Sequence, residues 1–257
     1  MALIESGYNP HATSRARAGG IWQFLTRTAK RFGLRVDKWV DERRDPEKST
    51  YAAAEYLKSL YGIFNCWDLA TAGYNAGEGK VLRAIKRANS QDFWEISRYR
   101  YLKQETKRYV PMFLAAVIIA KEPLKYGFSN IPYHPPLVYE KVVVPPETNL
   151  DWVAKVSEIE PSALRALNPS LSRGKTPPCS HPFEIKLPLG KKEIFEKKQL
   201  AYKQSAAVSG KRHTVRSGET LGSIANKYRI KCQVLCELND LSTQSMIKPG
   251  MTLLLPP

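Results

Sequence analysis

Hydrophobic residues in the first half of the chain recur every three or four positions, which is the spacing of one face of an α-helix. One such face consists of Ala53, Leu57, Leu60 and Phe64, and a later one consists of Tyr109, Phe113, Ala116 and Ala120. The apolar run at 113–120 is expected to be the core face of a buried helix. Because no alternating strand pattern interrupts residues 1–128, this region is predicted to be an all-α domain.

Polar residues mark where two helices of this domain begin. Asp45, Pro46 and Glu47 form a strong start signal. A side-chain acceptor at the cap, a proline of fixed φ and an acid that complements the helix dipole all suit a first turn. Thr26 is expected to cap an earlier helix that closes at Gly33.

The second half of the chain has a different pattern. Residues 131–136 form a stiff, proline-rich linker, and a β-type run follows at 139–144. The apolar frame then repeats with a shift of 71 residues, so that Leu150, Ala154, Leu164, Leu167 and Asn168 fall on Leu221, Ala225, Leu235, Leu238 and Asn239. Each copy ends in a short apolar strand closed by Leu-Pro. A strand, two short helices and a second strand are therefore predicted twice.

These patterns predict a multi-domain chain with an all-α domain followed by small α+β modules of β-α-α-β order. The expected boundaries are 1–128 for the helical domain, 129–190 for a linker and the first module, and 212–257 for the second module. Residues 191–211 are rich in Lys, Gln, Ala and Ser and are predicted to be a solvated basic tether.

Composition narrows the class of partner. Forty Lys and Arg against 24 Asp and Glu give a net charge of +16, which favours a polyanionic partner. Nucleic acid and a cell wall rich in carboxylates and phosphates both fit this charge. The chain carries none of the recognised nucleic-acid-binding motifs, so no nucleic-acid partner is expected. No apolar run approaches the ~20 residues that a membrane span needs.

Four cysteines and three tryptophans are interpreted mainly as packing residues. The cysteines are Cys66, Cys179, Cys232 and Cys236. Three of the five tryptophans, Trp22, Trp39 and Trp67, are interpreted as core residues, with a role as sugar platforms as the alternative. One disulfide remains an alternative if the compartment is oxidising. No pair of histidines accompanies Cys232 and Cys236 at metal-ligand spacing, so a zinc site is not expected.

Three blocks of residues carry the chemistry. The first runs from Glu5-Ser6-Gly7-Tyr8-Asn9-Pro10 through Ser14 to 18–24, the second is 72–77, and the third runs from Glu105 to Pro111. In this order and spacing they resemble the lytic transglycosylases with a goose-lysozyme-like fold. The resemblance covers about residues 1–128 and implies a lysozyme-like helical domain that acts on peptidoglycan.

The residues around Glu5 fit a general acid. Cleaving a glycoside requires a proton on the leaving oxygen, so a carboxylic acid must stay protonated near neutral pH. Apolar neighbours at 2–4 and Tyr8 are expected to raise the pKa of Glu5. Ordinary glycosidases pair two carboxylates, but no second Asp or Glu appears between Glu5 and Asp37.

The resemblance implies how one carboxylate suffices. Glu5 would protonate the β-1,4 bond between N-acetylmuramic acid and N-acetylglucosamine, then act as base on the muramyl C6 hydroxyl to close a 1,6-anhydro ring. By the same resemblance, the residues that line the cleft are Ser14, Gln23, Tyr74, Asn75, Glu105 and Tyr109. Structural alternatives remain for three of them: Ser14 caps a turn, Gln23 lies on a solvated helix face, or Tyr109 is a core residue.

The chain departs from the family pattern in two places. The family usually has Ala where Gly73 stands. Its members also carry a longer stretch before the catalytic acid, whereas only four residues precede Glu5 here. We therefore expect that a preceding segment holds a secretion signal or lipoprotein anchor, which would place the protein in the periplasm or at the inner face of the outer membrane.

The C-terminal copy of the repeat resembles a second family. The run from His213 to Leu221, Leu235-Cys-Glu-Leu-Asn239 and the turn after Ile247 are similar to LysM, a small β-α-α-β module that binds glycans containing N-acetylglucosamine. The resemblance implies glycan contacts at Gly218, Glu219, Thr220 and Ile247, although simple turn and capping chemistry would also explain the first three. The copy at 138–190 lacks the Ser-Gly-Glu-Thr turn.

Taken with the resemblance, the sequence predicts a lyase that cuts peptidoglycan glycan strands and is directed to the wall by LysM. The alternative is a catalytically inactive peptidoglycan-binding protein. No metal or organic cofactor is expected, since protonation and ring closure need only a placed carboxylate. A monomer is expected.

Overall fold

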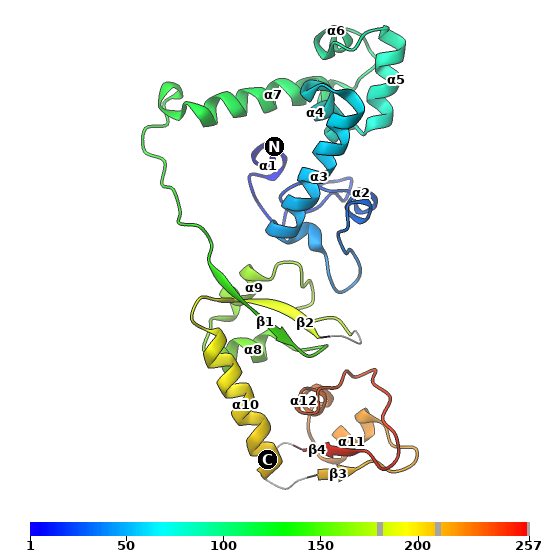
Figure 1. The fold of residues 1–257 in the computed structure, drawn as a ribbon, viewed down its shortest axis with the longest axis vertical. Helices are drawn as coiled ribbons and strands as arrows, with labels where there is room; N and C mark the ends of the chain where they lie inside the picture. Colours follow the sequence, from blue (N-terminus) through cyan, green and yellow to red (C-terminus); the bar gives the residue numbers. More distant parts are fainter. Residues whose placement is uncertain (179–181, 209–211, 256–257) are drawn as a thin grey trace. The chain divides into compact units, whose positions relative to one another are not determined.

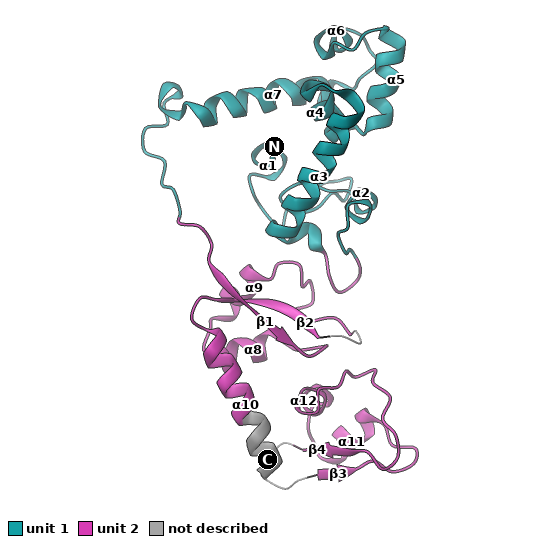
Figure 2. Ribbon diagram, viewed as in Figure 1, with its two compact units in different colours: residues 1–36, 42–134 teal, residues 37–41, 135–257 magenta. Residues whose placement is uncertain are grey.

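The computed structural model describes residues 1–178, 182–208 and 212–255, and for 202–208 it describes the backbone. The chain divides into two compact units, residues 1–36 with 42–134 and residues 37–41 with 135–257 (Figure 2). Among the described helices, none combines the length and the apolar character required to cross a membrane.

The first unit is helical (Figure 1). Its elements are α1 Ala2–Ser6, α2 Thr26–Arg31, η1 Glu42–Arg44, α3 Pro46–Phe64, α4 Trp67–Ala76, α5 Glu78–Ala88, α6 Phe93–Arg98, α7 Gln104–Lys121 and η2 Pro123–Tyr126. Isolated bridges join Thr13 to Gly19 and Gly19 to Phe24 in the loop between α1 and α2. The prediction of a helical first domain is confirmed.

Helix α3 begins where the sequence predicts. The Asp45 side chain accepts hydrogen bonds from the backbone N–H groups of Glu47 and Lys48, both at 3.0 Å, which satisfies two donors that a first turn leaves free. The apolar face of α3 buries Leu60 and Phe64 in a core shared with α4. This pairing fixes α4, the helix that carries two of the predicted site residues.

Two helix predictions in the first unit are wrong. Thr26 is the first residue of α2 rather than its cap, and Leu25 occupies the cap position without a side-chain hydrogen bond. The run at 113–120 is not buried: α7 buries Thr106, Tyr109 and Val110 in its first half, and its second half extends past α4 (Figure 1). Helical spacing shows which residues share a face, but it cannot show whether another element covers that face.

The second unit contains the predicted repeat. Its first module consists of β1 Tyr139–Val144, α8 Leu150–Ser157, α9 Pro161–Leu167 and β2 Phe183–Pro188, followed by α10 Lys192–Val208. Its second module consists of β3 Arg212–Thr214, α11 Leu221–Lys227, α12 Cys232–Leu238 and β4 Thr252–Leu254. The strands pair antiparallel within each module, β1 with β2 and β3 with β4. The β-α-α-β order is confirmed in both copies.

One asparagine ties the helices to the last strand in each module. Asn168 donates to the carbonyls of Leu164 and Lys186 at 2.9 and 2.8 Å and accepts from the Lys186 N–H at 2.9 Å. Asn239 makes the equivalent bonds with Leu235 and Leu254, at 2.8, 2.8 and 2.7 Å. The repeated asparagine is therefore a structural signature of the module.

The expected tether at 191–211 is largely a helix. Within α10, Phe195 is buried in the core of the first module, with its ring 6.0 Å from that of Trp152 in edge-on geometry. The burial of Phe195 was not predicted, because the composition of this segment is mainly polar. A helix that packs against a module needs only one narrow apolar face.

The tryptophans and cysteines differ in their surroundings. Trp22 packs against the core of the first unit and Trp39 against that of the first module. Trp67 is 56% exposed and lies 4.5 Å from the ring of Tyr61, so the core interpretation is wrong there. The described cysteines, Cys66, Cys232 and Cys236, are free thiols, and Cys179 lies outside the described residues.

Candidate active site

Glu5 lies in α1, a single turn of helix that ends at Gly7. Gly7 has φ +60°, a left-handed conformation that glycine adopts without strain and that closes a helix. The neighbouring Ser6 hydroxyl donates to the carbonyl of Ile21 at 3.0 Å. This bond joins α1 to the loop that contains Gln23, so two parts of the first sequence block meet in the structure.

The Glu5 carboxyl is half-buried and accepts a hydrogen bond from the hydroxyl of Tyr109 on α7. Burial raises the pKa of Glu5, because loss of water disfavours the ionised form. The bond from Tyr109 and the positive N-terminus oppose this effect, while the negative charge of Glu105 adds to it. The net direction is upward, as the sequence predicts.

Tyr109 has a buried hydroxyl and is not only a core residue. Burial, followed by the charge of Glu5 and the hydrogen bond to it, raises the pKa of the Tyr109 phenol well above its usual range. The phenol therefore remains a hydrogen-bond donor at every ordinary pH. It holds the Glu5 carboxyl in one position, through an interaction between residues 104 apart in the sequence.

Tyr74 on α4 lies in the same neighbourhood. Its hydroxyl donates to the carbonyl of Trp22 at 2.9 Å, and its ring lies 5.1 Å from Tyr56 and 6.2 Å from Phe24. Burial raises the pKa of Tyr74 well above its usual value, with further contributions from Glu5 and Tyr56. The electrostatic contribution from Glu5 shows that the structure brings these two predicted residues near each other.

Asn75 links the two helices that carry the tyrosines. Its side-chain oxygen accepts a hydrogen bond of 2.8 Å from the buried hydroxyl of Thr106 on α7. Thr106 precedes Tyr109 by three residues and therefore lies on the same face of α7. The sequence analysis did not single out Thr106, although its position between Glu105 and Tyr109 in the third block is a usable signal.

Ser14 and Gln23 belong to the loop between α1 and α2. The Ser14 hydroxyl accepts from the N–H of Ala18 at 3.1 Å, which is the turn-capping alternative. Gln23 has φ +48°, outside a helix, and its amide donates to the carbonyl of Gly20 at 2.8 Å. The helix-face alternative for Gln23 is therefore wrong. Within the described part of the chain, no hydrogen bond joins either residue to Glu5.

Arg43 supports this loop and was missed by sequence reasoning. Its guanidinium donates to the carbonyls of Arg17 and Phe24 at 2.8 and 3.0 Å, and the side chain is buried. A Cβ at Gly20, which has φ +78°, would lie 1.7 Å from the Arg43 carbonyl oxygen, so only glycine fits there. A structural arginine 20 residues downstream has no local signal in the sequence.

Glu105 was assigned to the cleft only as a sugar-contacting or supporting residue. It is exposed in the first turn of α7, yet its charge raises the pKa of Glu5, which places a second carboxylate within electrostatic range. No second acid was predicted, because the stretch between Glu5 and Asp37 contains no Asp or Glu. The fold brings this acid close from a position 100 residues away.

The predicted glycan contacts of the C-terminal module are held by bonds within the module. Glu219 accepts from the His213 ring at 2.6 Å and from the Arg216 N–H at 2.8 Å. These two bonds, the backbone bond first, lower the pKa of Glu219. Thr220 caps α11 in a reciprocal pair with Ser223, the capping alternative, and Gly218 has φ +81° in the turn.

His213 contacts this turn from β3. His213, which is buried, also contacts the hydroxyl of Tyr228 through its second ring nitrogen at 3.0 Å. Ile247 is partly buried against the module core. The loop before α11 is thus fixed from β3, which is a requirement for a rigid binding surface.

Comparison with known families gives three matches along the chain. Residues 1–97 match the transglycosylase SLT domain, residues 213–256 match the LysM domain, and residues 138–204 match the LysM-like domain of lytic transglycosylase MltD. The fold is accordingly a lysozyme-like helical domain followed by LysM-type modules with small antiparallel sheets. The chain therefore contains a transglycosylase SLT domain followed by two LysM-type domains.

Three individual proteins similar to this chain illustrate these matches. The chain is 34% identical over 268 aligned residues to the membrane-bound lytic murein transglycosylase D of Escherichia coli K12, covering 98% of this chain and 58% of that protein. The chain thus spans 58% of the length of that relative. It is also 37% identical to the peptidoglycan transglycosylase gp16 of phage T7, over 48% of this chain and 9% of that protein. The solved soluble lytic transglycosylase SLT70 from Escherichia coli matches with 28% identity and a TM-score of 0.37, covering 42% of this chain and 18% of that one.

Proposed function

We propose that this chain cuts the glycan strands of peptidoglycan without water, with Glu5 as both acid and base. The observation that carries the proposal is the Glu5 carboxyl itself: it is half-buried, its pKa is raised, and the Tyr109 hydroxyl holds it in place. A raised pKa extends the pH range over which a carboxyl keeps the proton that a glycosidic oxygen needs.

The chemistry balances around one carboxyl group. Protonated Glu5 gives its proton to the oxygen that links N-acetylmuramic acid to N-acetylglucosamine, and the bond from the muramyl C1 to that oxygen breaks. The resulting carboxylate then takes the proton of the muramyl C6 hydroxyl, and O6 bonds to C1. The products are a free N-acetylglucosamine end and a 1,6-anhydromuramic end, and Glu5 is protonated again.

The surrounding residues have supporting roles in this proposal. Tyr109 steadies the carboxylate that forms after the first proton transfer. Tyr74 and Asn75 face the reacting sugar from α4, and Glu105 from α7. Ser14 and Gln23 would contact the sugar from the loop between α1 and α2, where their hydrogen bonds fix the loop's conformation.

The C-terminal part would direct the enzyme to its substrate. We assign residues 1–128 to cleavage and 212–257 to glycan binding through Gly218, Glu219, Thr220 and Ile247, with 129–211 between them. The net charge of +16 is compatible with an anionic wall. Since the relative from Escherichia coli is named a membrane-bound murein enzyme, we place this chain in the periplasm.

The test is product analysis with the variant Glu5→Gln. Incubation with purified sacculi should release soluble muropeptides with 1,6-anhydromuramic ends, each one water lighter than a hydrolysis product. Glu5→Gln should lower the rate by at least two orders of magnitude, as expected for loss of a general acid, without loss of binding. Glu55→Gln, on the exposed side of α3, is the matched control and should leave the rate unchanged.

Each other outcome has a specific meaning. Reducing ends in the products would identify a hydrolase, and loss of those ends in Glu105→Gln would make Glu105 its second carboxylate. An inactive parent that still binds sacculi would identify a binding protein without catalysis. Glu5→Gln with at least a third of the parent rate would place the acid elsewhere.

A further inference from the structure

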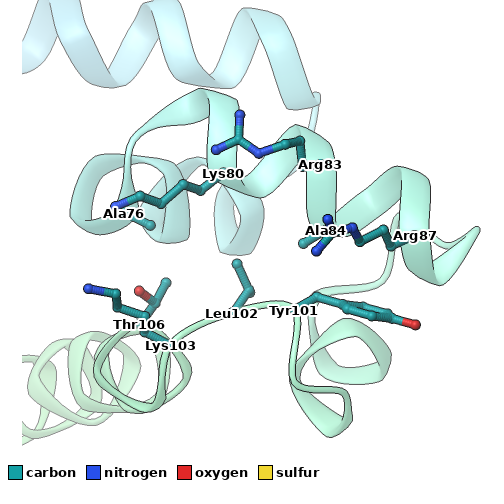
Figure 3. A pocket seen from close by; sticks show the side chains of 9 residues that line it. All are labelled: Ala76, Lys80, Arg83, Ala84, Arg87, Tyr101, Leu102, Lys103 and Thr106. Carbon is teal, nitrogen blue, oxygen red and sulfur yellow. The ribbon is translucent and has the colours of Figure 1, made fainter.

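A hollow with a basic rim lies beside the candidate active site in the first unit. Its volume is about 200 Å³. Helix α5 forms one side with Lys80, Arg83 and Arg87, and the segment 101–106 forms the other side with Lys103 (Figure 3). The three α5 residues are spaced at i, i+3 and i+7, which places them on one face of that helix.

The four cations of this rim have no acidic partner among the residues whose side chains the structure describes. All are exposed, and within the described residues none of them forms an ion pair. In contrast, Glu78 at the start of the same helix is bound by Arg31 at 2.7 Å, so it does not neutralise the rim. Four like charges around one hollow raise one another's energy, and an anion that enters between them relieves this repulsion.

The floor of the hollow is apolar. Leu102 and Ala84 are buried there, and the Thr106 hydroxyl beside them is already engaged with Asn75. An apolar floor under a cationic rim suits a carboxylate carried on an aliphatic chain better than a compact, strongly hydrated ion. The hollow also lies at the N-terminal end of α7, where the helix dipole adds positive potential.

Residues that line the hollow are neighbours in sequence of residues in the candidate active site. Thr106 on its wall is three residues from Tyr109, which corresponds to about 4.5 Å along the helix axis. Tyr109 in turn donates to Glu5. On the other side, Ala76 of the wall directly follows Asn75 in α4. The hollow is therefore lined from the same two helices, α4 and α7, that carry Asn75 and Tyr109.

We propose that this hollow is a subsite for a carboxylate of the peptide stem that the muramyl sugar carries. The inference rests on the proposed function, since it assumes that peptidoglycan is the substrate. The sugar rings of the glycan strand are neutral, whereas amino acids of the stem bear carboxylates on aliphatic side chains. Lys80 and Lys103, from opposite sides of the hollow, bind that carboxylate, and Leu102 contacts the chain that bears it.

The experiment compares two pairs of substitutions on two substrates. Lys80→Gln with Lys103→Gln removes two rim charges, and Lys86→Gln with Lys121→Gln removes two exposed charges of α5 and α7 outside the hollow. The substrates are soluble glycan strands of one length whose stems carry either free carboxylates or carboxamides. The rim pair should lower kcat/KM on the carboxylate strands by about fivefold to tenfold, as expected for two partly exposed charge contacts, and by less than twofold on the amidated strands. The control pair should change neither by more than twofold.

Three results would overturn the inference. Equal losses on both substrates would mean that the rim cations act on the fold or the glycan, and equal losses in the control pair would mean general attraction to an anionic substrate. A parent enzyme that cleaves both strands equally well would show a working enzyme without a carboxylate subsite. If the parent cleaves neither strand, the proposed function fails, and calorimetric binding of the two strands to Glu5→Gln then tests the subsite separately.

Discussion

Tyr109 donates its phenolic hydrogen to the carboxyl of Glu5 across 104 residues of sequence. This bond stabilises the ionised form of the acid, in opposition to burial, which stabilises the protonated form. These are the two largest of the effects that set how far the pKa of Glu5 lies above its ordinary value. The pH dependence of cleavage is therefore a direct readout of this pair.

The first prediction concerns Tyr109→Phe. A general acid works while protonated, so kcat/KM should fall as pH rises through the pKa of Glu5. Removing the hydroxyl removes an effect that lowers this pKa, so the alkaline limb of the profile should move to higher pH. The maximal rate should fall by about tenfold, since one hydrogen bond to a charged group contributes about 1.5 kcal/mol.

The control for this measurement is Tyr51→Phe, which removes a hydroxyl from an exposed tyrosine of α3. Its pH profile should match that of the parent. A limb that moves to lower pH in Tyr109→Phe would show that the hydroxyl raises the pKa of the acid, opposite to the geometry.

The second prediction concerns the asparagine shared by the two modules. Asn239→Ala removes three hydrogen bonds and leaves the N–H and carbonyl of Leu254 without their partner. Loss of these three partly buried bonds should lower the stability of the C-terminal module by about 2–3 kcal/mol. Thermal unfolding should show the loss, and amide exchange should accelerate at Leu254. Asn226→Ala, at an exposed position of α11, should leave both unchanged.

The third prediction concerns Gly73, where the family usually has Ala. A Cβ at this position would lie 2.9 Å from a ring carbon of Phe64 and 3.1 Å from a methyl carbon of Leu60. Overpacking costs about 1–3 kcal/mol, against about 1 kcal/mol gained from the helix propensity of Ala. Gly73→Ala should therefore be neutral to destabilising by about 2 kcal/mol in urea unfolding.

A matched pair of variants isolates the packing effect at Gly73. Gly62→Ala, in α3, meets no atom within 4 Å and should stabilise the protein by up to about 1 kcal/mol. Adding Phe64→Leu to Gly73→Ala should recover part of the loss, although Phe64→Leu alone is destabilising. If Gly73→Ala stabilises the protein as much as Gly62→Ala, Phe64 accommodates the added Cβ without cost. The contact then does not explain why glycine occupies position 73.

Local signals made much of the fold predictable. The cap at Asp45 and the repeat that contains Asn168 and Asn239 depend on residues close in sequence or on a fixed shift between two copies. The exposed end of α7 and the buried Phe195 were not predicted, because burial depends on which elements meet in space. Periodicity alone carries no such information.

In the candidate site, too, features that depend on local sequence were predictable and long-range contacts were not. The position of Glu5 and its raised pKa could be predicted from the first block and its apolar neighbours. The contact with Tyr109 could be expected only from a family resemblance, since no local pattern links residues so far apart. The charge of Glu105 near Glu5 and the support of the loop by Arg43 required the structure.

The last prediction concerns the C-terminal module. Residues 212–255 have a hydrophobic core of their own, built around Ile224, Leu235 and Leu253, so the piece 211–257 should fold alone and bind peptidoglycan. Deleting it should reduce turnover of insoluble sacculi much more than turnover of short soluble glycans. The reason is that a tether raises the effective concentration of the enzyme at an insoluble substrate without adding catalytic contacts.

The competing explanation for such binding is adsorption of a basic protein to an anionic wall, and salt separates the two. Attraction between exposed charges is largely screened near 1 M ionic strength, whereas a sugar-binding surface held in place by Glu219 and Thr220 is not. Binding of the isolated module should therefore persist in high salt, and soluble N-acetylglucosamine oligomers should compete with it. Glu219→Gln should weaken binding, because it weakens the bonds to His213 and Arg216 that fix the loop. If binding disappears in high salt and the soluble oligomers do not compete, the module binds the wall through its charge alone.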